Sequence, residues 1–207
     1  MNDELKSILE RVGNLYMRYG IKSVTMDDVA RELGISKKTL YQYVSDKADL
    51  VEKFYNTEFA KIKELFCQIK KRNINAIEQL LEVYKLLMHM LKTYSHTTEY
   101  DLKKYYPELS SSIHGIKRDT MYKALFDNMI KGKKEGLFRE DFDEEIIARI
   151  MVTRFECLPE STLFNITEFT SSHFISQLFI YHIHGIASEK GMEVFEKNKN
   201  QFDFITT

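Results

Sequence analysis

The chain has 207 residues, of which 43% are apolar and 29% charged, and its formal net charge is −1. It holds only 8 glycines and 2 prolines, whereas average usage would supply roughly 25 of the two together. Because sandwiches and barrels use these residues in frequent turns, a strand-rich fold is excluded. The 13% aromatic content and the low net charge also exclude a disordered chain. An all-α protein of about nine to ten helices is therefore expected.

The cysteines and the first residues indicate the cellular compartment. Cys67 and Cys157 lie far apart and outside any C-x-x-C or Cys/His cluster, so no disulfide scaffold, metal site or other cofactor is expected. The opening MNDELKSILERVG carries acids and no apolar signal segment, which favours a cytoplasmic protein. Residues 169–188 lack charged side chains but hold several Ser, Thr and His residues. They are too polar for a membrane span, so no membrane partner is expected.

Two short helices are predicted at the start of the chain. Apolar residues at three- and four-residue spacing over 5–19 predict the first helix, which Gly20 ends. Thr25 and Asp28 form a capping-box pattern that starts the second helix, and Gly34 ends it.

A third helix follows after a connection of three residues, 34–36, with Ser36 as its N-cap. Two helices joined this closely through a glycine form a helix-turn-helix. Leu40 and Val44 are spaced to point inward. The outward face then carries polar and cationic side chains that suit the major groove and the phosphates of DNA: Lys37, Lys38, Thr39, Tyr41, Gln42 and Tyr43.

A fourth helix is expected over 46–72, and Lys47 in its first turn would suit a helix end that faces a phosphate. An ordinary helical hairpin with a solvated face is the alternative, because residues 1–50 hold eight basic and eight acidic residues. The rest of the chain shows further apolar periodic segments, at about 74–95, 98–106, 107–136, 143–157, 165–187 and 189–202.

Residues 24–50, VTMDDVARELGISKKTLYQYVSDKADL, carry the T-x-x-x-(I/V)-A core, the G-(I/V)-S turn and the T-L-Y recognition helix. This segment closely resembles the DNA-binding domain of the tetracycline-repressor (TetR) family, over about residues 5–60. Lys38 departs from the small residue frequent in the family, and Val44 from the usual Phe.

The resemblance implies an N-terminal helix-turn-helix DNA-binding domain, residues 1–46, and a C-terminal helical bundle for effector binding and dimerisation, residues 47–207. Thr25 would direct the second helix's N-terminus toward a phosphate. The side chains that would face the major groove of DNA are Lys37, Lys38, Thr39 and Gln42. Those that would hold the DNA backbone are Tyr41, Tyr43 and Lys47.

The family also implies a homodimer built from the last two long helices, consistent with a two-fold operator. The alternative is that the uncharged helix is the centre of a monomeric bundle. The expected interface residues are Ile147, Met151, Phe155, Ile175, Leu178, Phe179, His182 and Ile186.

Methionine and aromatic residues of the body are candidates for a pocket that takes a small apolar or amphipathic effector, although such stripes also form plain core. The candidates are Tyr84, Met88, Met121, Tyr122, Phe126, Met129 and Phe155.

The expected function is a ligand-responsive, non-enzymatic transcriptional regulator, most simply a repressor, that binds a palindromic DNA operator as a homodimer. Two alternatives remain open: a DNA-binding factor without an effector, and an enzyme within the helical body.

Overall fold

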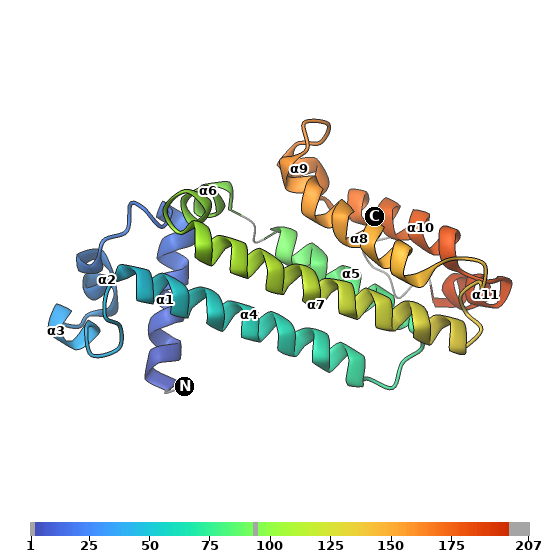
Figure 1. Ribbon diagram of the computed structural model, residues 1–207, viewed down its shortest axis with the longest axis horizontal. Helices are drawn as coiled ribbons and strands as arrows, with labels where there is room; N and C mark the ends of the chain where they lie inside the picture. The colour runs from blue at the N-terminus through green and yellow to red at the C-terminus, as the bar shows by residue number, and fades with distance from the viewer. Residues whose placement is uncertain (1–2, 93–94, 199–207) are drawn as a thin grey trace. The chain divides into compact units, whose positions relative to one another are not determined.

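The computed structural model describes residues 3–92 and 95–198 (Figure 1). Within these ranges the chain forms eleven α-helices, one 3-10 helix and no strand. The α-helices are α1 (Asp3–Tyr19), α2 (Met26–Leu33), α3 (Lys37–Leu40), α4 (Lys47–Lys71), α5 (Ala76–Lys92), α6 (His96–Tyr105), α7 (Pro107–Lys134), α8 (Glu144–Cys157), α9 (Ile166–Phe169), α10 (Ser172–Ile186) and α11 (Glu189–Asn198); the 3-10 helix is η1 (Leu158–Glu160).

The predicted ends of the first two helices and the predicted N-cap of the third are confirmed. Gly20 and Gly34 have φ values of 79° and 70°, the left-handed conformation in which glycine avoids a steric cost. The Thr25 hydroxyl accepts a hydrogen bond from the N–H of Asp28, and the Asp28 carboxylate accepts one from the N–H of Thr25. The Ser36 hydroxyl accepts a hydrogen bond from the N–H of Thr39 at 3.0 Å.

Two compact units make up the chain: unit 1 comprises residues 1–64 and 94–117, and unit 2 comprises 65–93 and 118–207. Helices α4 and α7 each begin in unit 1 and end in unit 2. These units are a division by packing, and the expected functional boundary after residue 46 stays a prediction.

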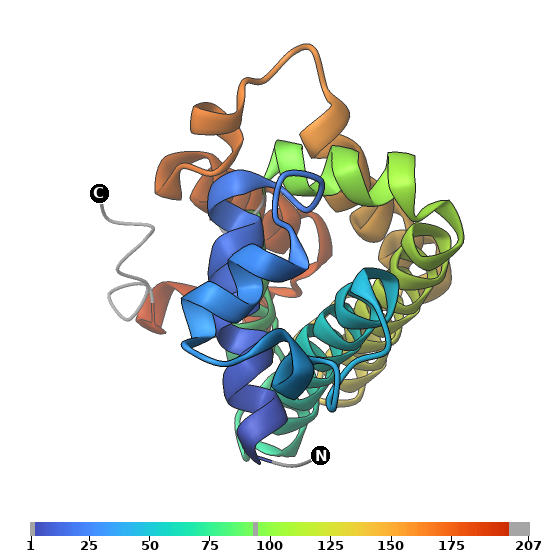
Figure 2. The same ribbon diagram turned by 90° about the vertical axis from the view of Figure 1, so that its left-hand side faces the viewer.

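Unit 1 packs α1–α3, α6 and the first parts of α4 and α7 around one apolar core (Figure 2). Tyr16, Leu40, Leu50 and Leu102 are all fully buried there. Tyr16 and Phe54 meet edge to face, with ring centroids 5.6 Å apart. The helix-turn-helix is thus anchored on the same core as α6.

Unit 2 has its own core, centred on α5 and α10. Tyr84 of α5 and Phe179 of α10 are fully buried and meet edge to face, with ring centroids 4.9 Å apart. The hydroxyl oxygen of Tyr84 lies 3.0 Å from Nδ1 of His182.

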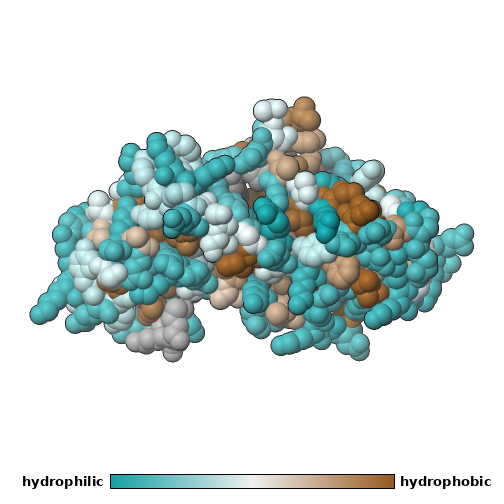
Figure 3. All heavy atoms as spheres, viewed as in Figure 1, coloured by the Kyte–Doolittle hydropathy of each residue, from teal (hydrophilic) through white to brown (hydrophobic). Residues whose placement is uncertain are grey.

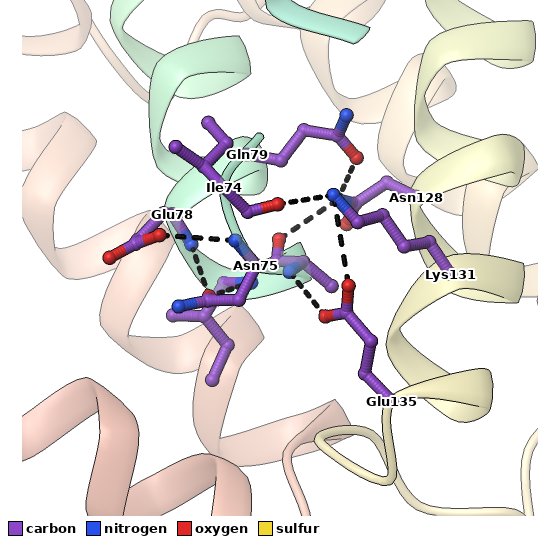
Figure 4. A network of polar contacts seen from close by, with 9 residues as sticks. Ile74, Asn75, Glu78, Gln79, Asn128, Lys131 and Glu135 are labelled. Carbon is purple, nitrogen blue, oxygen red and sulfur yellow. Dashed lines mark hydrogen bonds and ion pairs between the residues drawn. The ribbon is translucent and has the colours of Figure 1, made fainter. Parts of the chain in front are cut away.

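Polar side chains of α7 and of the turn that follows it hold the start of α5 (Figure 4). The Glu135 carboxylate accepts a hydrogen bond from the N–H of Ala76 at 2.7 Å, and Lys131 donates to the carbonyl of Ile74. The buried amide of Asn128 donates to the carbonyl of Ala76 at 2.9 Å and to Gln79 at 3.0 Å. The contact of Glu135 thus satisfies one of the N–H groups that a helix start otherwise leaves without a partner.

The structure corrects two predicted helices. The single helix expected over 165–187 is divided into α9 and α10, because the Ser171 hydroxyl accepts a hydrogen bond from the N–H of Phe174 and starts a new helix. This division accounts for eleven helices where about nine to ten were expected. Of the predicted segments 74–95 and 189–202, residues 93–94 and 199–202 lie outside the described residues, and Ser95 is the N-cap of α6.

The third helix is shorter than expected. It is α-helical only over Lys37–Leu40, and residues 41–43 form a turn. There the N–H groups of Gln42 and Tyr43 donate to the carbonyls of Thr39 and Leu40, three residues back. This tighter pattern is common at the end of a helix.

No helix among the described residues is both long and apolar enough to cross a membrane.

Candidate DNA-binding interface

The helix-turn-helix consists of α2, the turn at 34–36 and α3. Leu40 and Val44 are buried, at 0% and 2% exposure, so they fix which side of this segment faces the core. The N–H of Ile35 donates to the carbonyl of Ala30 at 3.1 Å, which holds the turn against the end of α2. The opposite side of α3 is therefore turned toward solvent.

None of the eight predicted DNA-contacting residues is buried. Thr25, Lys37, Lys38, Tyr41 and Gln42 are exposed. The remaining three, Thr39, Tyr43 and Lys47, are half-buried. A face with cations, an amide and aromatic hydroxyls offers both phosphate and base-edge contacts.

At the start of α2, the capping box already uses the side chain of Thr25. Its hydroxyl donates to the Asp28 carboxylate at 2.6 Å. Hydrogen bonds from the side chain and backbone of Thr25 lower the pKa of Asp28. Asp28 is thus kept charged and holds the helix start rigid.

Two lysines of the predicted surface make contacts that the sequence did not indicate. Lys37 of α3 forms an ion pair with Asp27 of α2. The Lys47 ammonium donates to the backbone carbonyl of Lys22 at 3.1 Å. Burial lowers the pKa of Lys47, while the charges of Asp101 and Asp28 act in the opposite direction. The predicted phosphate-binding lysine is therefore held in place by the loop before α2.

The turn after α3 is tied to α4. Lys53 donates to the carbonyl of Tyr43 at 2.9 Å and to Asp49 at 2.8 Å. Asp49 in turn accepts from the N–H of Ser45 at 2.8 Å. A hydrogen bond from Tyr43 to Glu4 raises the pKa of the Tyr43 hydroxyl. Tyr43 is thus held from both α1 and α4.

Most of the predicted dimer-interface residues are buried inside unit 2. Ile175 and Phe179 are 0% exposed. Four more are at most 8% exposed: Met151, Phe155, His182 and Ile186. These six side chains are largely covered by their own chain, and their place in a dimer interface stays a prediction. Ile147 and Leu178 are half-buried and stay candidates.

Most of the predicted effector residues are likewise core. Five of the seven are buried: Tyr84, Met88, Met121, Met129 and Phe155. The other two, Tyr122 and Phe126, are half-buried, and their stacked rings have centroids 5.8 Å apart. A pocket of about 460 Å³ lies elsewhere in unit 2, lined by α8, α10 and the segment between them. None of the seven predicted residues is in its lining.

Residues 8–54 match the family model described as bacterial regulatory proteins, tetR family. The match covers α2, α3 and the turn between them, the elements that present the predicted DNA-contacting face. Over residues 8–54 the chain is thus similar to the DNA-binding domain of the TetR family.

Among curated relatives, an uncharacterized HTH-type transcriptional regulator, YvaF of Bacillus subtilis (strain 168), is 32% identical over 102 residues, which are 49% of this chain and 53% of YvaF. The HTH-type transcriptional regulator SAB2452 of Staphylococcus aureus is 27% identical over 112 residues, covering 49% of this chain and 60% of that one. The chain thus matches only about half the length of these relatives.

Solved structures share the fold over most of the chain. A transcriptional regulator from Cytophaga hutchinsonii superposes with a TM-score of 0.71 at 17% identity, over 90% of this chain and 100% of that one. A putative transcriptional regulator from Saccharomonospora viridis, solved in complex with choline, gives 0.70 at 19% identity, over 91% and 100%. At these identities the likeness concerns the fold.

Proposed function

We propose that the chain is a transcriptional regulator that binds a palindromic operator as a homodimer and responds to a small apolar or amphipathic effector. The observation that carries this proposal is the solvent-facing side of α3 and of the turn after it, where lysines, tyrosines and Gln42 lie opposite buried Leu40 and Val44. A helix of this kind, fixed on a rigid core, suits the major groove.

A homodimer would give each half of a palindrome its own α3. Exposed apolar residues on α8 support such an interface: Ile146 and Ile150 are 55% and 48% exposed and lie one turn apart on one face of the helix. Figure 3 shows apolar atoms at the surface in the region of α8. Half-buried Ile147 lies beside them.

Selection of bound fragments from the source genome tests the DNA-binding function. We expect a palindromic sequence, and Gln42→Ala should reduce discrimination at one base pair of each half-site by about 1–3 kcal/mol. Lys123→Ala, which removes an exposed lysine from α7 in unit 2, should leave selection unchanged. Recovery of random fragments at low ionic strength would overturn the proposal.

Sedimentation tests the dimer separately. Ile150→Asp should convert a dimer into a monomer, because the interface would then bury an unpaired charge. The same charge at an exposed polar position of another helix, Ser112→Asp in α7, is the control for added charge. An unchanged dimer in Ile150→Asp would remove α8 from the interface.

A further inference from the structure

A patch of lysines and tyrosines lies beside the helix-turn-helix in unit 1. It consists of Lys22, from the loop between α1 and α2, and of Tyr100, Lys104 and Tyr105 from α6. All four residues are exposed. The end of α6 reaches this loop because α6 packs against α1 (Figure 1). These four residues are called the Tyr105 patch below.

The ring of Tyr105 brings two ammonium groups together. The ammonium of Lys22 lies 5.3 Å from the centroid of this ring, and that of Lys104 lies 5.5 Å from the same centroid. Lys104 also donates a hydrogen bond to the hydroxyl of Tyr100 at 3.0 Å. An aromatic ring attracts each cation, but two cations held at one ring repel each other.

Neither ammonium is neutralised by a carboxylate. Within residues 3–92 and 95–198, Lys22 and Lys104 form no ion pair. The hydrogen bond with Tyr105 raises the pKa of Lys22, whereas the charge of Lys104 acts in the opposite direction. The charge of Asp101 also acts on Lys22, but its carboxylate is buried and accepts the backbone N–H of Lys22. An anion bound between the two lysines would therefore relieve their repulsion.

Lysines in the last turn of a helix often only complement its dipole. That role fits Lys103 and Lys104 of α6, but it does not account for Lys22, which comes from another segment. The position of Lys22 instead connects the patch to the predicted DNA-contacting residues. Its carbonyl accepts a hydrogen bond from Lys47 at 3.1 Å, and Thr25, the N-cap of α2, follows three residues later. The patch is thus continuous with the surface expected to meet the DNA backbone.

We propose that the Tyr105 patch is a second phosphate-binding site, which holds the DNA backbone beside the phosphate bound by Lys47. Each strand of a duplex carries a phosphate about every 3.4 Å along the helix axis, so a phosphate held by Lys47 has neighbours close by. Lys22 and Lys104 bind such a neighbour as two point charges, and the hydroxyl of Tyr105 adds a donor. The site touches no base edge, so it adds affinity without sequence preference. The choice of DNA as the partner rests on the proposed function.

The salt dependence of DNA binding by the full chain tests the site. The probe is the duplex recovered by fragment selection, and fluorescence anisotropy measures its binding over a series of salt concentrations. The double variant Lys22→Gln, Lys104→Gln should lower the slope of log K against log salt by about 0.9 for each phosphate contact that is lost, with sequence preference unchanged. The matched control, Lys103→Gln with Lys123→Gln, removes the same charge from exposed positions outside the patch and should lower the slope far less.

Ethylation interference locates the contacts, because an ethylated phosphate has lost its charge. The unmodified chain should show interference at the phosphate that Lys47 holds and at a neighbour of that phosphate. Lys47→Gln should lose the first position alone, and the double Gln variant should lose the second alone. If the double variant also loses the first position, Lys22 acts only by placing Lys47, and the proposal would be overturned.

A variant that keeps the charge separates electrostatics from structure. Lys22→Arg with Lys104→Arg should retain the slope of the unmodified chain, and circular dichroism checks that each variant is folded. An equal loss of slope in the Arg and Gln variants would overturn the proposal. So would a Gln variant whose slope is as steep as that of the unmodified chain.

A second duplex separates this proposal from the proposed function. If selection recovers no palindrome, a duplex of random sequence is titrated instead. A slope that falls in the Lys22, Lys104 Gln variant and not in its control would then uphold the phosphate site while the regulatory function failed. A chain that binds neither duplex would overturn both proposals.

Discussion

The carboxylate of Asp101 accepts a hydrogen bond from the backbone N–H of Lys22 at 2.8 Å, across 79 residues of sequence. Asp101 belongs to α6 and is only 6% exposed. The carbonyl oxygen of the same residue, Lys22, accepts a hydrogen bond from the ammonium of Lys47. The backbone of Lys22 thus joins α6 to Lys47, the lysine predicted to hold a DNA phosphate. A second contact of α6 comes from the hydroxyl of Thr98, which donates to the carbonyl of Tyr16 at 2.9 Å.

Removal of this acceptor should destabilise unit 1. Asp101→Ala leaves the N–H of Lys22 without its partner, which we expect to lower the free energy of unfolding by about 1–3 kcal/mol. Asp101→Asn keeps an oxygen that can accept the bond and should lose less. Urea denaturation measures both values. If the two variants lose equal stability, charge and not the hydrogen bond is what matters at this position.

Lys47 should contribute to DNA affinity without reading sequence. If its ammonium leaves the Lys22 carbonyl for a phosphate, Lys47→Gln weakens binding to every DNA alike and lowers the slope of log K against log salt by about 0.9. Fluorescence anisotropy over a series of salt concentrations measures that slope. An unchanged slope together with altered sequence preference would contradict the assignment, and Lys123→Gln serves as the control.

Asp27 should compete with DNA for Lys37. Their ion pair is exposed, with side-chain exposures of 51% for Asp27 and 58% for Lys37, and such pairs are worth about 0.2–1 kcal/mol. Asp27→Asn should therefore strengthen binding to all sequences by about 1.4- to 5-fold. Glu32→Gln removes the same charge from the opposite end of α2. An equal gain in both variants would show that only the net charge of the domain had mattered.

Local features of the fold could be predicted because they depend on neighbouring residues. The ends of α2 follow from Thr25, Asp28 and Gly34, all within one or two turns of the helix boundary. The division at Ser171 was missed because the apolar pattern continues across it, and a serine inside a helix is not rare enough to mark an end. The inward side of α3 and of the turn after it was predicted from Leu40 and Val44, and both are buried.

Long-range features of the candidate sites could not be predicted in the same way. The helix of residues 172–186 is apolar nearly all round, so its sequence does not tell which side its own chain covers. Phe179 and Ile175 therefore looked like interface residues and are largely covered by their own chain. The contact of Asp101 with Lys22 has no local signature, because it depends on how α6 packs against the end of α1.

The stability of unit 2 should depend on pH through His182. Burial lowers the pKa of this imidazole to about 3, and the charge of Arg154 acts in the same direction. The ordinary value is 6.5, so below that pH the unfolded chain takes up a proton that the folded chain does not. The free energy of unfolding should therefore fall by about 1.4 kcal/mol per pH unit between about pH 6 and pH 4 on account of this residue, and its contribution is fully present above pH 6.5.

His182→Gln tests this contribution, because the glutamine does not titrate and can still accept a hydrogen bond from Tyr84. Its unfolding free energy, measured with urea at several pH values, should change less steeply with pH than that of the unmodified chain by about one proton. His184→Gln, on the exposed side of the same helix, is the matched control. Parallel pH profiles for the unmodified chain and His182→Gln would mean that the buried imidazole takes up its proton in the folded state, since only then would its removal leave the slope unchanged.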